Sequence, residues 1–194
     1  GVLMKELAAY KYNDPKEPLV LLEELRRKRT AAGRKVDDLE EAYLNLLQSE
    51  EATKDAKMFA SKQLGMVGSH KSISVLADML LDFDLAYMAR YALERIPNSN
   101  VATALRNAVP LVGPEHRAGI IASLGTLKDT RSISIISAAV SDRDERVVSA
   151  ALRALAAMPS SAAAAASPPT PSGRRPPRAT RRRASSGRSR RRTG

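Results

Sequence analysis

The stretch IIASLGTLKDTRSISIISAAVSDRDERVVSAALRAL, residues 120–155, decides the fold. Its apolar side chains fall into three short segments, and within each segment they recur every three or four positions. That spacing places them on one face of an α-helix. Between the segments stand Lys128-Asp129 and Asp142-Arg143-Asp144, which favour turns. The stretch therefore predicts three short amphipathic helices joined by tight turns.

This pattern repeats along the chain. Leu124 is followed twelve residues later by Ile136. The same interval of twelve occurs upstream in two further pairs, Leu64 with Leu76 and Leu93 with Leu105. Leu64, Leu93 and Leu124 are the first members of these pairs, and Leu155 continues their series. The four positions are spaced 29, 31 and 31 residues apart. This period fits two short helices and two turns per unit, with each unit opening at the helix that carries residue 64, 93, 124 or 155.

A single helix pair cannot bury its own apolar face, so the units must stack on one another to form a continuous core. Residues 52–158 are therefore predicted to form an all-α repeat array, an α-solenoid. Residues 1–51 are predicted to form helices that precede it. In that segment Asp14-Pro15 is typical of a helix start, Gly33 of a helix end, and a second helix is expected over residues 36–47.

The repeats resemble HEAT repeats, specifically the short HEAT-like repeats of phycobilin lyases. The resemblance rests on the Leu64-Gly65 and Leu124-Gly125 steps and on the runs at 72–76 and 132–136 that come after them. The stretch MARYALERIP, residues 88–97, is similar to bacterial HEAT-repeat proteins of unassigned activity. The resemblance implies about four HEAT-like helix pairs, and it implies a fold used mostly as a binding scaffold. Fold alone does not assign an activity.

The net charge is concentrated at one end of the chain. The 194 residues include 32 Lys and Arg against 21 Asp and Glu, a formal net charge of +11. Residues 159–194 hold ten of the Arg and no acid, which leaves 22 basic and 21 acidic residues in the first 158. This tail contains only Arg, Ser, Ala, Pro, Thr and Gly. Because such a composition cannot build a core, we predict that the tail is disordered.

Three interpretations of the tail stay open. It could bind nucleic acid or another acidic partner, with an affinity that falls steeply with salt. The side chains that would contact phosphate are Arg174, Arg175, Arg181, Arg182, Arg183, Arg190, Arg191 and Arg192. It could be an inert tail. It could also be the product of reading a GC-rich coding sequence in the wrong frame, which yields mainly these residue types.

The tail begins where the second helix of the fourth unit is expected. The apolar face of the helix before it would then lack a partner, and an exposed apolar face promotes self-association. The residues of this predicted patch are Val147, Val148, Ala151, Leu152 and Leu155.

Composition argues against several kinds of site. The chain has no Cys, which excludes disulfides, iron–sulfur clusters and thiolate zinc sites, but it leaves the cellular compartment open. Two Phe and five Tyr are too few to favour a base-stacking platform. No apolar run is long enough to suggest a membrane span.

No arrangement of residues indicates catalysis. His70 and His116 are interpreted as solvated residues at helix starts, and Glu40 and Glu41 as a solvated helix face. No nucleophile stands beside a base, and no Gly-rich phosphate loop is recognisable. We therefore expect no catalytic residue, no cofactor and no metal site.

Tyr87 and Tyr91 lie four residues apart on one predicted helix, and Arg90 lies between them. Tyr and Arg are enriched at binding hot spots, so these three residues form a candidate partner-binding patch. The alternative is that they pack against a neighbouring repeat.

The function predicted from these observations is a non-catalytic protein–protein interaction scaffold. In such solenoids the second helices, here over 72–81, 100–109 and 131–140, usually line the binding face. The alternatives are binding of nucleic acid or an acidic partner through the tail, and a HEAT-like lyase or accessory subunit of an enzyme. The identity of the partner stays open.

Overall fold

The computed structural model describes residues 2–159, and every regular element in that range is a helix. The α-helices are α1 (Val2–Ala9), α2 (Glu17–Ala31), α3 (Asp37–Gln48), α4 (Lys54–Val67), α5 (His70–Met79), α6 (Ala86–Leu93), α7 (Asn100–Ala108), α8 (Pro114–Thr126), α9 (Ile133–Ala139) and α10 (Glu145–Ala157). Two short 3-10 helices precede α8 and α9, namely η1 (Val109–Leu111) and η2 (Thr130–Ser132). Within residues 2–159, none of these helices has the length and apolar character needed to cross a bilayer.

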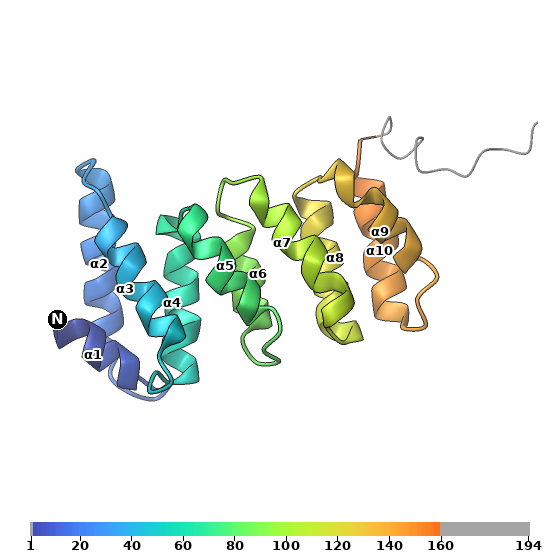
Figure 1. The fold of residues 1–194 in the computed structure, drawn as a ribbon. Coiled ribbons are helices and arrows are strands. Elements are labelled where there is room, and N and C mark those ends of the chain that lie inside the picture. The colour runs from blue at the N-terminus through green and yellow to red at the C-terminus, as the bar shows by residue number, and fades with distance from the viewer. Residues whose placement is uncertain (1, 160–194) are drawn as a thin grey trace, which may run out of the picture.

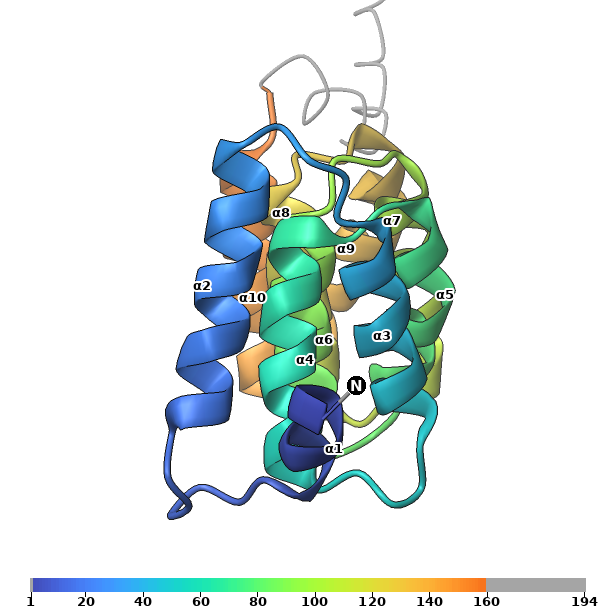
Figure 2. The same ribbon diagram turned by 90° about the vertical axis from the view of Figure 1, so that its left-hand side faces the viewer.

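The helices stand in two layers that run the length of the molecule (Figure 1). Viewed from the end, α2, α4, α6, α8 and α10 form one layer, and α3, α5, α7 and α9 form the other (Figure 2). We call these the even layer and the odd layer. Each helix pair stacks on the next through contacts such as α4 with α6 and α5 with α7. The arrangement confirms the predicted all-α solenoid of about four helix pairs preceded by extra helices.

The pairs begin one helix earlier than the sequence pattern suggested. Among helices adjacent in sequence, the close contacts join α3 to α4, α5 to α6, α7 to α8 and α9 to α10. The helix carrying each repeated Leu is thus the second member of a pair. Helix α10 consequently completes the fourth pair rather than opening an unfinished one.

The repeated apolar residues are the centre of the core. Leu64, Leu93 and Leu124 in the even layer are all fully buried. Their partners twelve residues later in the odd layer, Leu76, Leu105 and Ile136, are fully buried as well. The buried apolar residues form one continuous cluster from Leu7 to Met158, as expected where stacked units share a core.

The Leu-Gly steps mark where helices of the even layer approach most closely. A Cβ added at Gly125 would lie 2.8 Å from the Cα of Ala154 on α10, and one at Gly65 would lie 3.3 Å from the Cα of Ala92 on α6. The equivalent position after Leu93 is Glu94, and α8 accordingly packs less closely on α6 than on α10.

Polar side chains join α6 to α8 instead. The Arg90 Nη1 donates to the backbone oxygen of Gly119 at 3.0 Å and to Ser123 Oγ at 3.2 Å. Ser123 in turn donates to Glu94 Oε1 at 2.5 Å. Burial lowers the pKa of Arg90, although the nearby Glu94 carboxylate opposes that effect. The contact between α6 and α8 therefore depends on side-chain hydrogen bonds, whereas the α4–α6 and α8–α10 contacts depend on close approach of the backbones.

Helix α2 starts later than predicted. It begins at Glu17 with Pro18 in its first turn, while Asp14 accepts a hydrogen bond from the backbone nitrogen of Lys11 at 2.7 Å. Asp14 thus closes a turn rather than capping the helix. Gly33 lies just beyond the end of α2 with φ +62°, the left-handed conformation that glycine tolerates at helix ends.

Glu40 was predicted to be solvated, and that prediction is wrong. Its side chain is 3% exposed and accepts hydrogen bonds from Ser69 N at 2.7 Å, Ser69 Oγ at 2.9 Å and Ser72 Oγ at 2.7 Å. Burial by itself would raise the pKa of Glu40, but these donors outweigh it and hold the pKa below its ordinary value. The carboxylate ties α3 to the start of α5.

The predicted apolar patch on α10 is correct only in part. Leu152 is 52% exposed, and Val148 and Leu155 are half-buried. Val147 and Ala151 are fully buried, because α10 packs on both α8 and α9. The eight tail arginines predicted to contact phosphate lie outside the described residues.

Candidate partner-binding surfaces

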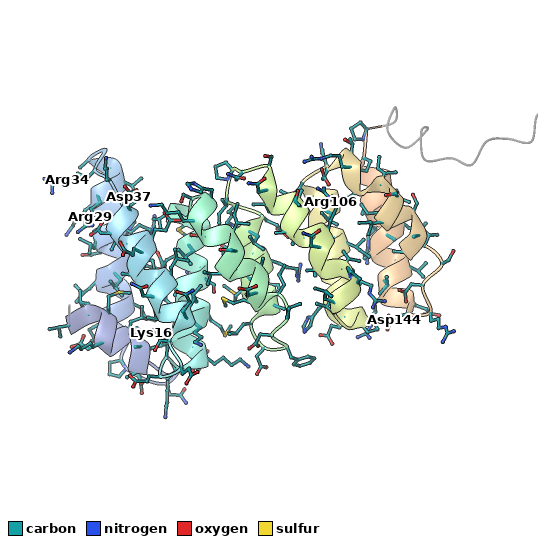
Figure 3. All side chains as sticks on the ribbon, viewed as in Figure 1. Lys16, Arg29, Arg34, Asp37, Arg106 and Asp144 are labelled. Carbon is teal, nitrogen blue, oxygen red and sulfur yellow. The ribbon has the colours of Figure 1, made fainter. Side chains whose placement is uncertain are left out.

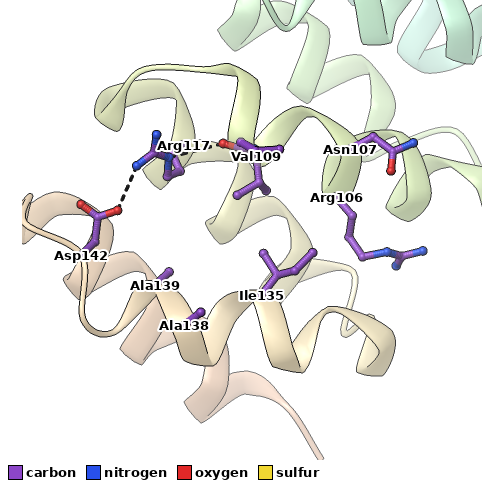
Figure 4. Close-up of a pocket in the computed structure, with 9 residues that line it drawn as sticks. Arg106, Asn107, Val109, Arg117, Ile135, Ala138, Ala139 and Asp142 are labelled. Carbon is purple, nitrogen blue, oxygen red and sulfur yellow. Dashed lines mark hydrogen bonds and ion pairs between the residues drawn. The ribbon is translucent and has the colours of Figure 1, made fainter.

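A groove of about 650 Å³ separates α7 from α9 in the odd layer (Figure 4). It lies on two of the three helices that sequence reasoning assigned to the binding face. Residues Ile135, Ala138 and Ala139 on α9 face Val109 and Pro110 beyond the end of α7. The two alanines are small, and they leave open the space that larger side chains would fill.

One end of the groove is fixed by Arg106 on α7. Its guanidinium pairs with Asp129 and donates to Thr103 Oγ1 at 2.8 Å. The side chains of Arg106 and Asp129 are only 14% and 11% exposed, so the pair is largely shielded from water. Asp129 stands just before η2, and the pair therefore joins α7 to the start of the α9 segment.

The other end is fixed by Arg117 on α8. Its Nη1 donates to Asp142 Oδ2 at 3.0 Å, and its Nε and Nη2 donate to the backbone oxygens of Val109 and Val112 at 3.3 and 3.0 Å. The backbone N–H of Asp144 and the Arg117 guanidinium together hold the pKa of Asp142 below its ordinary value. Figure 3 shows Arg106 toward the upper edge of the array and Asp144 toward its lower edge.

The chemistry of the groove is set by this arrangement. Its walls are apolar, and its two charged ends are already paired within the protein. The exposed Asn107 contributes a polar amide to the rim. Such a slot suits the apolar side chains of a short peptide segment, because small-residue walls admit them and no unpaired charge opposes their burial.

The patch predicted from the sequence lies on the other layer. Tyr87 on α6 is 64% exposed, and the Arg90 guanidinium carbon lies 5.6 Å from the centre of its ring. Tyr91 is half-buried beneath Arg95, whose guanidinium carbon lies 3.5 Å from the ring centre. Arg90 itself is turned into the α6–α8 contact, so of these three residues Tyr87 presents most surface.

A further exposed apolar cluster was missed in the sequence. Leu81, Phe83 and Leu111 are more than half exposed, and they line a cleft of about 350 Å³ beside the start of α8. Phe83 meets His116 edge to face, with ring centres 5.1 Å apart. His116 is therefore half-buried against an aromatic ring rather than solvated as predicted. Because Leu81 and Phe83 lie in the loop between α5 and α6 whereas Leu111 ends η1, no sequence periodicity links them.

In the part of the chain that the structure describes, no cluster of His, Asp and Glu is arranged to hold a metal ion.

Comparison with known proteins agrees with this architecture. A family model for HEAT repeats matches residues 113–168, a range that contains α8, α9 and α10. No curated protein matches the chain. Residues 113–168 therefore match HEAT repeats, and the helix pairs before residue 113 stack in the same way.

Proposed function

We propose that this protein is a non-catalytic scaffold that binds a partner protein in the groove between α7 and α9. The observation that carries the proposal is the groove itself, an apolar slot of about 650 Å³ lined by Ala138 and Ala139 between neighbouring helices of the odd layer. HEAT repeats are typically protein-interaction scaffolds. The groove lies on two of the helix ranges that the resemblance assigned to the binding face, although these helices are the first and not the second members of their pairs.

The groove is preformed, because ion pairs within the protein fix both of its ends. The pairs Arg106–Asp129 and Arg117–Asp142 hold α9 at both ends, so the slot keeps its width without a ligand. A rigid, preformed site loses less conformational entropy on binding than a flexible one. The partner segment that fits is short and apolar, with a polar backbone group facing Asn107.

The test is to select peptides from a random displayed library on the full-length wild-type chain and to measure their affinity for variants. Ala138→Arg places a long charged side chain inside the groove, and Ser74→Arg places the same side chain on an exposed position of α5, in the same layer but away from the groove. We expect Ala138→Arg to weaken peptide binding at least about tenfold, which corresponds to about 1.4 kcal/mol. Ser74→Arg should bind as wild type does.

Two outcomes would contradict the proposal. One is that the library yields no peptide that binds the chain. The other is that selected peptides bind Ala138→Arg and wild type equally well. Thermal melts of both variants establish that they are folded, so a loss of binding can be assigned to the groove.

The candidate patch on α6 is a second proposed contact, supported by the exposure of Tyr87. Tyr87→Ala in the same assay tests it. If that substitution weakens binding and Ala138→Arg does not, the even layer is the binding face.

Binding of nucleic acid through residues 159–194 is the alternative function, supported by ten Arg in a segment without acids. It predicts binding that weakens steeply as salt is raised and disappears when residues 159–194 are deleted.

A further inference from the structure

The outward face of α10 differs from that of α8, the helix before it in the even layer. Counting back one repeat of 31 residues, Leu152 corresponds to Ile121 and Leu155 to Leu124. Ile121 and Leu124 are fully buried, because the next helix of the layer covers them. Leu152 is 52% exposed and Leu155 is half-buried. The last helix thus carries the apolar residues of an internal repeat.

Residues 160–194 contain only Arg, Ser, Ala, Pro, Thr and Gly. They lack the Leu, Ile and Val residues that occupy core positions in the repeats upstream.

We infer that the cover is a second copy of this chain, with the α10 helices of two copies packed antiparallel about a twofold axis. This inference is independent of the proposed partner groove, which lies between α7 and α9. Val148, Leu152 and Leu155 have the i, i+4, i+7 spacing of a helix–helix contact. The small residues Ser149 and Ala156 lie beside them on the same face and allow close approach.

Size and charge both fit a self-complementary pair. In an antiparallel pairing near the middle of α10, Leu152 of one copy lies over Ser149 of the other, and Arg153 approaches the end that carries Glu145. Glu145 and Arg153 are exposed, and neither forms an ion pair with another described residue. Two copies therefore supply each other with the missing countercharges.

The contact should be weak. Helix α10 has 13 residues, which makes it about 20 Å long and about 10 Å wide. A face of that size buries less than the roughly 800 Å² per partner of a standard interface. We therefore expect a reversible dimer whose population rises with protein concentration.

Sedimentation velocity of the full-length chain over a concentration series tests the inference. Wild type should shift from monomer to dimer as concentration rises, and Leu152→Glu should remain a monomer over the same range. Leu21→Glu is the matched control, since Leu21 is 48% exposed on α2, at the opposite end of the stack from α10 (Figure 1).

Three results would overturn the inference. One is a wild type that stays monomeric at every concentration. Another is a mass that grows beyond the dimer, because only an unclosed head-to-tail contact continues to add copies. The third is loss of the dimer in Leu21→Glu but not in Leu152→Glu.

Discussion

At the scale of single residues, the stack is set by the side chain that comes directly after each repeated Leu. Glycine at 65 and 125 lets the next helix of the even layer approach to backbone contact. Glu94 at the equivalent position prevents that approach, and the small Ser123 opposite accommodates its carboxylate. The Leu-Gly step is thus a packing signal rather than a turn signal, because both glycines lie inside helices.

Gly125→Ala should destabilise the protein. The new Cβ would lie 2.7 Å from Ala154 Cβ and 2.8 Å from Ala154 Cα, and the backbone of α10 must move to admit it. Overpacking of this kind costs about 1–3 kcal/mol, more than the gain of about 1 kcal/mol from replacing glycine inside a helix. Chemical denaturation measures the free energy of unfolding.

Gly65→Ala is the comparison for that experiment. Its nearest neighbours would lie 3.3 Å away, so a shift of a few tenths of an ångström relieves the contact and the loss should be smaller. A Gly125→Ala protein as stable as wild type would show that α8 and α10 are not in backbone contact at this point.

Glu40 should make the stability of the fold depend on pH. The fold lowers the pKa of Glu40 from its ordinary value of 4.5, so its stabilising effect is complete above that value and is lost as the pH falls below it. The difference in unfolding free energy between wild type and Glu40→Gln should therefore shrink as the pH is lowered from about 5 to about 3. Urea titrations at each pH measure this difference.

Glu41→Gln is the control for this titration, since Glu41 is exposed on the same helix. A difference between wild type and Glu40→Gln that stays constant across this pH range would mean that the hydrogen bonds from Ser69 and Ser72 do not favour the charged form.

At the scale of elements, α9 is held by arginines that come from other helices. Arg106 of α7 fixes its beginning through Asp129, and Arg117 of α8 fixes the residues after its end through Asp142. A helix of seven residues has little stability of its own, so these pairs and its buried isoleucines keep it in place.

Arg106→Ala should cost about 1.5–3 kcal/mol, because it leaves the nearly buried Asp129 carboxylate without its main charged donor. Arg131→Ala is the matched control. Arg131 lies 3.8 Å from the same carboxylate, but its side chain is 66% exposed, and an exposed pair contributes less than about 1 kcal/mol. Equal losses in the two variants, measured by thermal unfolding, would contradict the role assigned to Arg106.

The elements themselves were largely predictable from the sequence. Apolar periodicity and turn-favouring residues such as Lys128-Asp129 and Asp142-Arg143-Asp144 located the helices, and the interval of twelve found the core residues. The grouping of helices into pairs was not predictable in the same way. Periodicity shows only that two helices alternate, whereas inter-helix contacts decide which neighbours pack together.

At the scale of the whole molecule, the sequence predicted the solenoid, but not the groove between α7 and α9. Small residues at 138 and 139 open a slot only because Val109 and Pro110 stand opposite, 29 residues earlier in the chain. Glu40 was misassigned for a related reason, since its donors Ser69 and Ser72 come from another repeat. Contacts between repeats leave no local pattern.

A scaffold of this kind must receive its partner segment in the groove between α7 and α9. The most direct test is to record amide chemical shifts of the full-length chain while adding a peptide selected on the wild-type protein. We predict the largest shifts on both walls of the groove, at Asn107, Val109, Ile135 and Ala138. Shifts confined to α6 around Tyr87, or spread over both layers without a maximum at the groove, would contradict this role.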